Sequence, residues 1–402
     1  MVALELEGLT KRWPGITVQV DLQVEPGSLV ALAGPSGCGK STVLRMIAGL
    51  CPPDSGRVII GQDDVSALSP RDREVGMVFQ DYALFPHLDV VSNVAYGLTI
   101  RGIPRKTRET LARDILESVG MLSFAKRWPH ELSGGEQQRV ALARTIATRP
   151  RVVLFDEPLS SLDSSLRKHL RTEIRSQQKR FGLTAIYVTH DLEEAMAMAD
   201  KVAVMDNGAI LQFSTAKELW NKPASAIVAR FLGSGPCLPI LHVEASGEKL
   251  VAMTSTGRFP LQSSTTGSLR FRESRGQSPV AAKNIMVTGT DLAVLSSTEY
   301  AATPELLSEI PSTIPEVCIF FERSQAQPIP PGLSGQLDVQ DNDGYFSAKC
   351  IGTDFAGDTV DCLMSAEQTS FPLRLPLELA PEPGDHVRFR VKSEKIRIIP
   401  AG

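Results

Sequence analysis

A glycine-rich loop between an apolar strand and a helical segment constrains the fold of this 402-residue chain more than any other feature. Residues 29–33 read LVALA, which is a continuous apolar strand of the kind found in sheets covered on both faces. The loop GPSGCGKS follows directly, and Val43, Leu44 and Ile47 then recur at helical spacing. A strand, a GxxxxGK[ST] loop and a helix in this order predict a phosphate-binding loop rather than a chance turn.

The residue types of this loop suit the binding of a nucleotide. Glycines let successive backbone N–H groups turn inward around phosphate oxygens, and the start of the following helix adds partial positive charge. We expect Lys40 to reach the β- and γ-phosphates of ATP and the Ser41 hydroxyl to bind Mg²⁺. The nucleotide contacts expected in this region are Gly34, Pro35, Ser36, Gly37, Cys38, Gly39, Lys40, Ser41 and Thr42.

A second apolar strand ends in two acids. Residues 152–155 read VVLF, and Asp156 and Glu157 follow, so both carboxylates are expected at the carboxyl edge of the sheet, where ligands bind in such folds. We expect Asp156 to hold Mg²⁺ and Glu157 to orient or deprotonate an attacking water. A solvated acidic strand end is the alternative for this segment alone, and the preceding phosphate-binding loop favours the catalytic interpretation.

Apolar strands alternate with long helical patterns over the first part of the chain, to about residue 235. Further strands are expected at 75–79, 185–188 and 202–205, and Asn207-Gly208 predicts a hairpin. We therefore predict an α/β domain over 1–235, with a largely parallel core sheet, an antiparallel β subdomain and a helical subdomain at about 86–150. Short alternating strands and turn clusters predict a small all-β, barrel-like domain over 236–402.

Charge and composition argue against several other classes of protein. The formal net charge is −4, whereas a general nucleic-acid binder needs a basic surface for phosphate-backbone affinity. No apolar run approaches the ~18 residues that cross a bilayer, and the start of the chain lacks the pattern of a secretory signal. The six cysteines form no CxxC pair and are expected to be reduced thiols in a cytosolic protein, with no structural metal.

A third motif, LSGGEQQR at residues 132–139, precedes an apolar helical run. Ser133, Gly134, Gly135 and Glu136 stand at the predicted helix start, where backbone N–H groups bind anions by the same logic as in the first loop. An ordinary helix cap is the alternative for this motif in isolation. Two such helix starts in one chain favour a second phosphate-facing site.

The chain resembles the nucleotide-binding subunits of ABC transporters from Met1 to about Gly233, and LSGGE resembles their signature motif. The resemblance implies a head-to-tail dimer in which ATP lies between the glycine-rich loop of one copy and the signature of the other. It also implies roles for four further residues. Trp13 would stack on the adenine, and Gln80 would sense Mg²⁺ and the attacking water. Asp163 would lie at the dimer seam, and His190 would contact the γ-phosphate. Tyr is commoner than Trp at the first of these positions, and Gln is usual where the signature has Glu136. Neither exchange is expected to inactivate the site.

The same resemblance implies partners and a location. The segment Tyr82–His87 resembles the one that, in importer ATPases, lines a groove for a short cytoplasmic helix of a separate membrane permease. A loop packed on its own helical subdomain is the alternative. A second copy of the chain is expected, although a heterodimer with a related ATPase stays open, and the protein is expected at the cytoplasmic face of the membrane. An extracytoplasmic solute-binding protein is implied as an indirect partner. No nucleic acid is expected as a partner.

Family similarity alone indicates the substrate and the role of the C-terminal region. Ferric iron, a polyamine or a similar small solute is expected first, and a sugar next. The β-rich tail resembles the oligonucleotide-fold-like regulatory extension of importer ATPases, with a dimer-bracing domain that binds nothing as the alternative. The competing class of function is a soluble ABC ATPase without a permease. The single phosphate-binding loop and the lack of a heptad-rich insert disfavour it.

Overall fold

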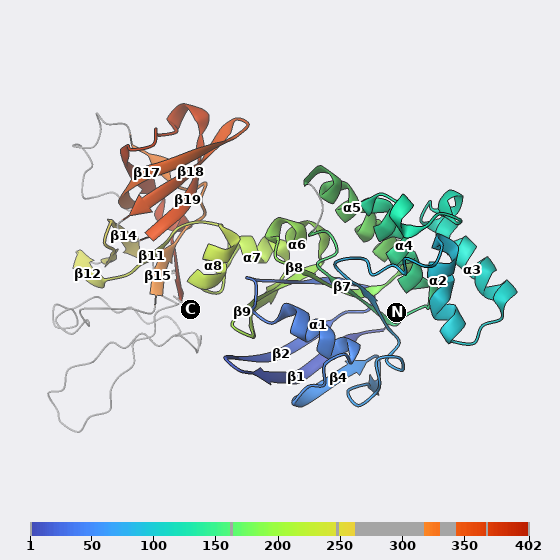
Figure 1. The fold of residues 1–402 in the computed structure, drawn as a ribbon. Helices are drawn as coiled ribbons and strands as arrows, with labels where there is room; N and C mark the ends of the chain where they lie inside the picture. The colour runs from blue at the N-terminus through green and yellow to red at the C-terminus, as the bar shows by residue number, and fades with distance from the viewer. Residues whose placement is uncertain are drawn as a thin grey trace, which may run out of the picture. The chain divides into compact units, whose positions relative to one another are not determined.

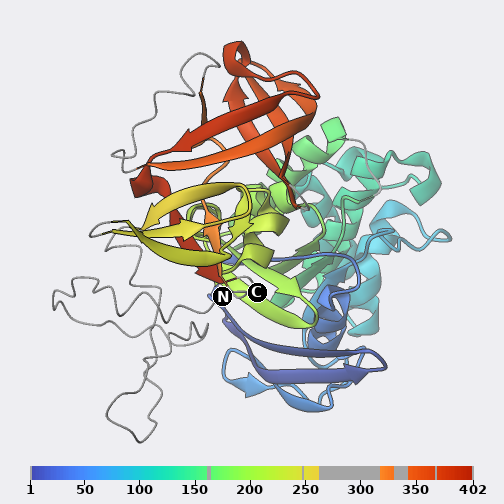
Figure 2. The same cartoon turned by 90° about the vertical axis from the view of Figure 1, so that its left-hand side faces the viewer.

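The computed structural model describes residues 2–160, 164–246, 249–261, 317–329, 343–366 and 369–400. Contacts divide the chain into two compact units, Met1–Leu219 and Trp220–Gly402, which are described separately (Figures 1 and 2). The sequence-based domain boundary at about Gly235 lies further along the chain and stays a prediction. In the part of the chain that is described, no helix combines the length and the apolar character needed to cross a membrane.

A six-stranded sheet forms the centre of the first unit, in the order β10-β9-β3-β8-β7-β6. Its strands β6, β7, β8, β3 and β9 run parallel, which confirms the predicted parallel core. Strand β10 pairs antiparallel with β9 through the predicted Asn207-Gly208 hairpin, where both residues have positive φ. The strands are β3 (Leu29–Ala33), β6 (Val75–Val78), β7 (Val152–Asp156), β8 (Thr184–Thr189), β9 (Lys201–Asp206) and β10 (Ala209–Ser214).

A second sheet of the first unit is antiparallel, in the order β2-β1-β4-β5. Side chains of β2 alternate between buried and exposed because one face of the sheet is covered. Helix α1 (Lys40–Ala48) packs between the two sheets, and its apolar side chains share one core with residues of both (Figure 1). The strands are β1 (Leu4–Trp13), β2 (Ile16–Val24), β4 (Ser55–Ile60) and β5 (Asp63–Asp64).

A buried arginine closes the end of α1 that lies away from the glycine-rich loop. Arg73 is 2% exposed, and its guanidinium donates to the carbonyl oxygens of Met46 at 2.7 Å and Ile47 at 3.0 Å. It also donates to the carbonyls of Leu68 and Ser66. These bonds satisfy the C-terminal carbonyls of the helix and hold it against the neighbouring loop.

Helices α2, α3 and α4 form the helical subdomain, which has its own apolar core. Helix α4 belongs to two cores, because its Val140 and Ala143 face α2 and α3 while its Leu142 and Ile146 pack under the six-stranded sheet. Besides α1, the helices of the unit are α2 (Val90–Ile100), α3 (Arg105–Ser118), α4 (Gly134–Ala147), α5 (Ser164–Phe181) and α6 (Leu192–Met198), with 3-10 turns at Leu122–Phe124 and Pro129–Glu131. Helix α7 (Ala216–Asn221) contains the boundary between the two units.

The second unit is built from antiparallel strands after one short helix, α8 (Ala226–Leu232). One sheet has the order β11-β15-β21, and a larger one runs β12-β13-β14-β17-β18-β19, with β20 pairing β17 and β16. Phe259, Phe321, Phe346 and Phe389 stack at its centre. These strands confirm the predicted β-rich C-terminal region, and all six cysteines of the chain are free thiols.

The bounds in this second unit are β11 (Cys237–Pro239), β12 (His242–Ser246), β13 (Lys249–Met253), β14 (Gly257–Leu261), β15 (Val317–Phe320), β16 (Gln327–Pro328), β17 (Gly344–Ala356), β18 (Thr359–Ala366), β19 (Thr369–Pro376), β20 (His386–Val391) and β21 (Arg397–Pro400). Two 3-10 turns, Leu377–Leu379 and Ser393–Lys395, flank β20.

Candidate functional site

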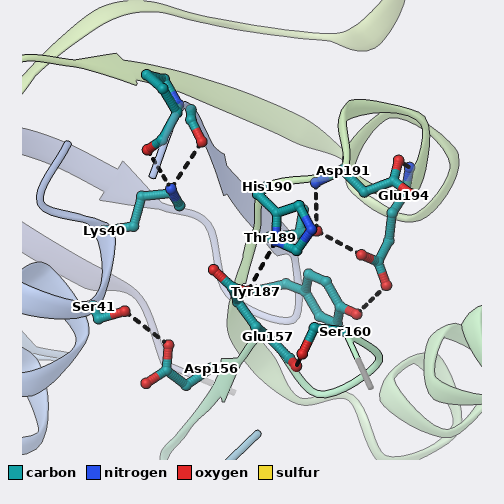
Figure 3. Close-up of polar contacts among 12 residues, drawn as sticks. Lys40, Ser41, Asp156, Glu157, Ser160, Tyr187, Thr189, His190, Asp191 and Glu194 are labelled. Atoms are coloured by element: carbon teal, nitrogen blue, oxygen red, sulfur yellow. Dashed lines mark hydrogen bonds and ion pairs between the residues drawn. The ribbon is translucent and has the colours of Figure 1, made fainter. Parts of the chain in front are cut away.

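The glycine-rich loop joins β3 to α1 in a conformation that needs its glycines. Gly37 and Gly39 have φ of +82° and +105°, which residues with a Cβ rarely adopt. At Gly34 an added Cβ would lie 2.2 Å from the Met205 carbonyl oxygen. Lys40 begins α1, and its Nζ donates to the carbonyl oxygens of Gly34 and Pro35 at 2.8 Å (Figure 3). The ammonium group therefore lies inside the curve of the loop.

The hairpin between β9 and β10 ties this loop to the antiparallel sheet. The Gly208 N–H donates to the Cys38 carbonyl at 3.1 Å, and the Gly208 carbonyl accepts from the Gln19 N–H at 2.8 Å. An added Cβ at Gly208 would lie 2.1 Å from the Thr17 carbonyl oxygen, so only glycine fits. Cys38 itself is buried, and that burial raises the pKa of its thiol.

Two hard oxygen donors meet where β7 ends beside α1. The Ser41 hydroxyl donates to Asp156 Oδ1 at 3.1 Å (Figure 3). A hydroxyl and a carboxylate at this separation are the donor types that Mg²⁺ takes from a protein when phosphates and water complete its shell. Among the described residues, no group of three or more His, Cys, Asp and Glu side chains could hold a metal by itself. The donor set thus fits a cation shared with a bound phosphate.

Glu157 and His190 face each other from the ends of neighbouring strands. Because β7 and β8 are parallel with Asp156 opposite Val188, the residues that follow both strands lie at one edge of the sheet. Glu157 has φ of +45°, and its N–H donates to the Val188 carbonyl at 3.1 Å. Its Oε2 lies 2.9 Å from His190 Nδ1 (Figure 3). A left-handed non-glycine residue here places the carboxylate beside the imidazole.

The other predicted nucleotide-site residues lie on several elements. Gln80 is exposed in the turn that follows β6, the neighbour of β7. Trp13 ends β1, is 47% exposed and has the Lys11 ammonium 5.5 Å from its ring centroid. Thr42 lies in the first turn of α1, after Ser41. Asp163 lies outside the described residues.

The signature residues form a helix cap at the start of α4. Ser133 is the N-cap residue, and its Oγ accepts from the Glu136 N–H at 3.4 Å. In return the Glu136 carboxylate accepts from the Ser133 N–H at 2.7 Å and from the Ser133 hydroxyl at 2.8 Å. The Ser133 backbone N–H lowers the pKa of Glu136. The geometry is therefore a capping box, and a role in binding phosphate stays a prediction.

Comparison with known proteins was made against families and individual relatives. A family model described as ABC transporter matches residues 18–160. The Fe(3+) ions import ATP-binding protein FbpC of Rhizobium etli is 47% identical over 266 residues, which cover 65% of this chain and 75% of the relative. The same-named protein of Brucella abortus (strain 2308) is 46% identical over 269 residues, 66% of this chain and 76% of the relative.

The chain belongs to the ATP-binding subunits of ABC transporters.

A relative with a different printed cargo matches this ABC ATPase at a similar level. The spermidine/putrescine import ATP-binding protein PotA of Marinobacter nauticus is 43% identical over 256 residues, 63% of this chain and 69% of the relative. All of these relatives are importer subunits, and none of them favours the soluble alternative. The resemblance inferred from the motifs is thus confirmed, and with it ATP binding and an importer-type ATPase.

Several structurally important residues of the ABC ATPase were missed in the motifs. Asn93 is fully buried on α2, and its amide donates to the carbonyls of Phe85, Leu88 and Asp89 while accepting from the Phe85 N–H. Arg144 on α4 donates to the carbonyls of Tyr82 and Ala83. Both side chains thereby hold the segment that follows Gln80. Their partners are backbone carbonyls, which every residue carries, so the sequence contains no signal for these pairs.

A polar cluster next to His190, buried except for the half-buried Asp191, was also missed. It consists of Tyr187, Thr189, Asp191 and Glu194, on β8 and at the start of α6 (Figure 3). Asp191 is the N-cap of α6 and accepts from the Glu194 N–H, so the Asp-x-x-Glu spacing could have predicted a helix start here. It could not have shown that the Glu194 side chain turns inward.

Proposed function

We propose that this chain hydrolyses ATP in a head-to-tail dimer and thereby powers solute import through a separate membrane permease. The observation that carries the proposal is the pairing of Glu157 Oε2 with His190 Nδ1 at 2.9 Å, beside the Ser41–Asp156 pair and the glycine-rich loop. These groups are the parts that phosphoryl transfer to water requires, because positioning and charge stabilisation dominate that reaction.

The chain's own residues have separable roles in this reaction. The backbone N–H groups of the loop and the Lys40 ammonium bind the phosphates and balance their negative charge. Ser41 and Asp156 would hold Mg²⁺, which supplies positive charge to the phosphate oxygens when it is bound. Glu157 orients water and accepts its proton, and His190 holds the Glu157 carboxylate toward the γ-phosphate. Gln80, after β6, reports on the same position from the neighbouring strand.

The dimer is proposed because two helices of one chain, α1 and α4, start at glycine-containing motifs, and both helix starts are proposed to bind phosphate. The Ser133 turn of one copy would complete the phosphate site of the other, so that ATP joins the two protomers and its hydrolysis releases them. Trp13 is proposed to stack on the adenine, and its exposed ring suits that role. Asp163 is proposed at the seam between the protomers.

The Glu157→Gln variant tests the assignment. It keeps the shape of the side chain and removes the base, so the chain should bind ATP, hydrolyse it at least a hundredfold more slowly, and accumulate as a dimer in the presence of Mg²⁺ and ATP. Sedimentation or multi-angle light scattering measures the dimer, and phosphate release measures the rate. A variant with the native turnover rate, or one that stays monomeric with ATP at high protein concentration, would contradict the proposal.

A membrane permease is proposed to dock on the segment Tyr82–His87. In this segment Phe85 stacks against Tyr96 of α2 with ring centroids 4.4 Å apart, while Pro86 and His87 are exposed. Asn93 and Arg144 fix the backbone of the segment, so the exposed surface exists before any partner binds. Such preorganisation lowers the entropic cost of docking a short helix.

A charge placed on this surface should separate docking from catalysis. His87→Glu should leave the ATPase rate of the isolated chain within about twofold and abolish co-purification with the permease encoded beside the gene. Ile100→Glu, at an exposed apolar position on the end of α2, is the matched control and should retain the permease. Loss of the permease in both variants would argue against a specific docking segment.

Ferric iron and a polyamine are proposed as the first candidate substrates because the relatives' printed names contain them. A similar small solute, a sugar as the next candidate and delivery by an extracytoplasmic binding protein are proposed from the family resemblance alone. Work at the cytoplasmic face of the membrane follows from the permease proposal. Transport of radiolabelled iron and of radiolabelled spermidine into proteoliposomes that contain the whole importer distinguishes these candidates. Transport of neither compound would overturn both the iron proposal and the polyamine proposal.

A further inference from the structure

We propose that Glu194 is a positioning residue for the reaction: through hydrogen bonds to Tyr187 and Thr189 it fixes the turn that carries His190. The inference rests on the function proposed above, because His190 matters only if Glu157 acts on water there. Nothing in the family match or in the relatives' names concerns Glu194. The contacts shown in Figure 3 carry it.

The Glu194 carboxylate is held by two hydroxyl groups from β8. The residue is 4% exposed, Oε2 accepts from the Thr189 hydroxyl at 2.5 Å, and Oε1 accepts from the Tyr187 hydroxyl. Both donors point to the same side of the strand because they are two residues apart. The carboxylate of Glu194, in the first turn of α6, is therefore hydrogen-bonded to the last residues of β8.

A closed ring of hydrogen bonds joins the two neighbours of His190 to Glu194. The Asp191 N–H donates to the Thr189 hydroxyl oxygen at 2.9 Å, which fixes the residues on either side of His190 relative to each other. The Glu194 N–H donates to Asp191 Oδ1 at 3.0 Å. With the bond from Thr189 to the carboxylate, the ring runs through Thr189, Asp191 and Glu194 and encloses the turn.

The imidazole of His190 depends on that turn for its direction. Its side chain is 51% exposed, so packing does little to orient it, and its Nδ1 contact to Glu157 spans two strands. The turn is anchored on the other side as well. The Tyr187 ring lies 5.7 Å from the Phe155 ring, centroid to centroid, and Phe155 directly precedes Asp156 and Glu157. One cluster thus braces both residues of the Glu157–His190 pair.

The Glu194 carboxylate is buried without a paired cation. Asp191 of the same cluster pairs with Arg167 at 3.3 Å, whereas in the described part of the chain no Lys or Arg forms a salt bridge with Glu194, and burying an unpaired carboxylate costs free energy. Burial, and next the negative charge of Glu194, raise the pKa of Tyr187 well above its usual value, so its hydroxyl stays a donor at neutral pH. An apolar side chain of similar size would avoid the cost of the buried charge and would leave the Tyr187 and Thr189 hydroxyls without this acceptor.

The experiment compares Glu194→Met with Glu193→Met, its exposed neighbour in the same helical turn. We expect Glu194→Met to fold with a lower thermal midpoint, because two buried hydroxyls lose their acceptor. Its KM for ATP should stay within about twofold of the native value, and its kcat should fall by about ten- to a hundredfold. Glu193→Met should leave kcat unchanged. Glu194→Gln keeps one acceptor oxygen and should restore most of the rate, which a requirement for mere bulk would not explain.

A double-mutant cycle gives the deciding readout. If Glu194 acts through His190, then Glu194→Met should cause no further loss of kcat in a His190→Ala background. Multiplicative losses, an unchanged kcat in Glu194→Met alone, or a raised KM with native kcat would each overturn the proposal. If His190→Ala itself keeps the native rate, the proposed role of His190 fails instead, which separates the two ideas.

If Glu194→Met fails to fold, a second variant still tests the proposal. Tyr187→Phe deletes one of the two hydroxyl donors and conserves the ring that packs on Phe155. It should lower kcat several-fold with an unchanged KM, and it too should have no effect in the His190→Ala background. A full native rate in Tyr187→Phe and in Glu194→Gln together would show that the cluster does not position His190.

Discussion

Replacing Arg144 by methionine should loosen the turn that follows Gln80 and slow ATP hydrolysis without unfolding the protein. Arg144 donates to the carbonyl oxygens of Ala83 at 2.6 Å and Tyr82 at 2.9 Å, and its guanidinium lies 5.3 Å from the centroid of the Phe85 ring. Both bonded residues have positive φ, 58° at Tyr82 and 45° at Ala83. Arg144 thus holds two consecutive left-handed residues of a non-glycine turn.

The expected loss of free energy follows from the backbone strain of the turn and from the hydrogen bonds of Arg144 that oppose it. Left-handed geometry costs roughly 1–2 kcal/mol for each residue with a Cβ, so the turn stores about 2–4 kcal/mol. Two hydrogen bonds from a charged donor contribute about 3 kcal/mol together when the donor is partly exposed, the low end of their range. The two quantities are similar in size. Methionine keeps the apolar stem and removes the bonds, so the turn is free to relax.

Hydrogen exchange measured by mass spectrometry reads the turn directly. A loss of about 3 kcal/mol corresponds to about a hundredfold faster exchange of the amides in residues 79–85. Phosphate release should show kcat reduced about tenfold, because Gln80 lies on the same turn. Arg113→Met, an exposed arginine of α3, is the matched control and should change neither quantity.

A second substitution tests the cause. Ala83→Gly removes the Cβ from a left-handed residue and lowers the cost of that conformation by about 1 kcal/mol. In the Arg144→Met background it should recover part of the lost protection and part of the rate. Native exchange and native kcat in Arg144→Met, or no recovery with Ala83→Gly, would refute the idea that Arg144 restrains strain.

Three further predictions follow from charges and caps. Glu136→Gln removes the negative charge from the Ser133 turn where a partner's phosphate is proposed to bind, so ATP-dependent dimerisation should strengthen by about two- to tenfold in sedimentation experiments; weaker dimerisation would contradict it. Arg73→Met leaves buried carbonyls unpaired and should lower the free energy of unfolding by about 3–5 kcal/mol in urea titrations, and a change below 1 kcal/mol would refute that role. The Arg374 hydrogen bond lowers the pKa of Asp361, so its contribution to stability is full above the unfolded pKa of about 4 and is lost as the pH falls through the lower folded value. Asp361→Asn should therefore be destabilising at pH 7 and nearly neutral at pH 2, and an equal effect at both would contradict this.

The parts of the fold that sequence could predict are those in which chemistry and position coincide along the chain. The strand before the glycine-rich loop, the loop and α1 are contiguous, so residue types alone identify them. The Asn207-Gly208 hairpin is local for the same reason, because both residues must take positive φ. For His190 the sequence offered only the family resemblance, which implied a γ-phosphate contact, and the parallel pairing of β7 and β8 explains why Glu157 and His190 lie at one edge of the sheet.

Other parts of the site depend on contacts whose partners have no sequence signature. Asn93, Arg144 and Arg73 all bind backbone carbonyls, and an acceptor of that kind is present at every residue. At Ser133 and Glu136 the difficulty is different. A helix cap and a phosphate site use the same N–H groups, so one pattern of residues is compatible with both.

Gly208 has a consequence for the choice of nucleotide. Its backbone bonds the loop at Cys38 on one side and β2 at Gln19 on the other, and β2 pairs with the strand that ends in Trp13. Backbone hydrogen bonds therefore connect the glycine-rich loop to the sheet that carries Trp13, the residue proposed to stack on the base. A nucleotide that stacks on Trp13, as proposed, with its phosphates in the loop would have to match the distance that these backbone connections set between the two.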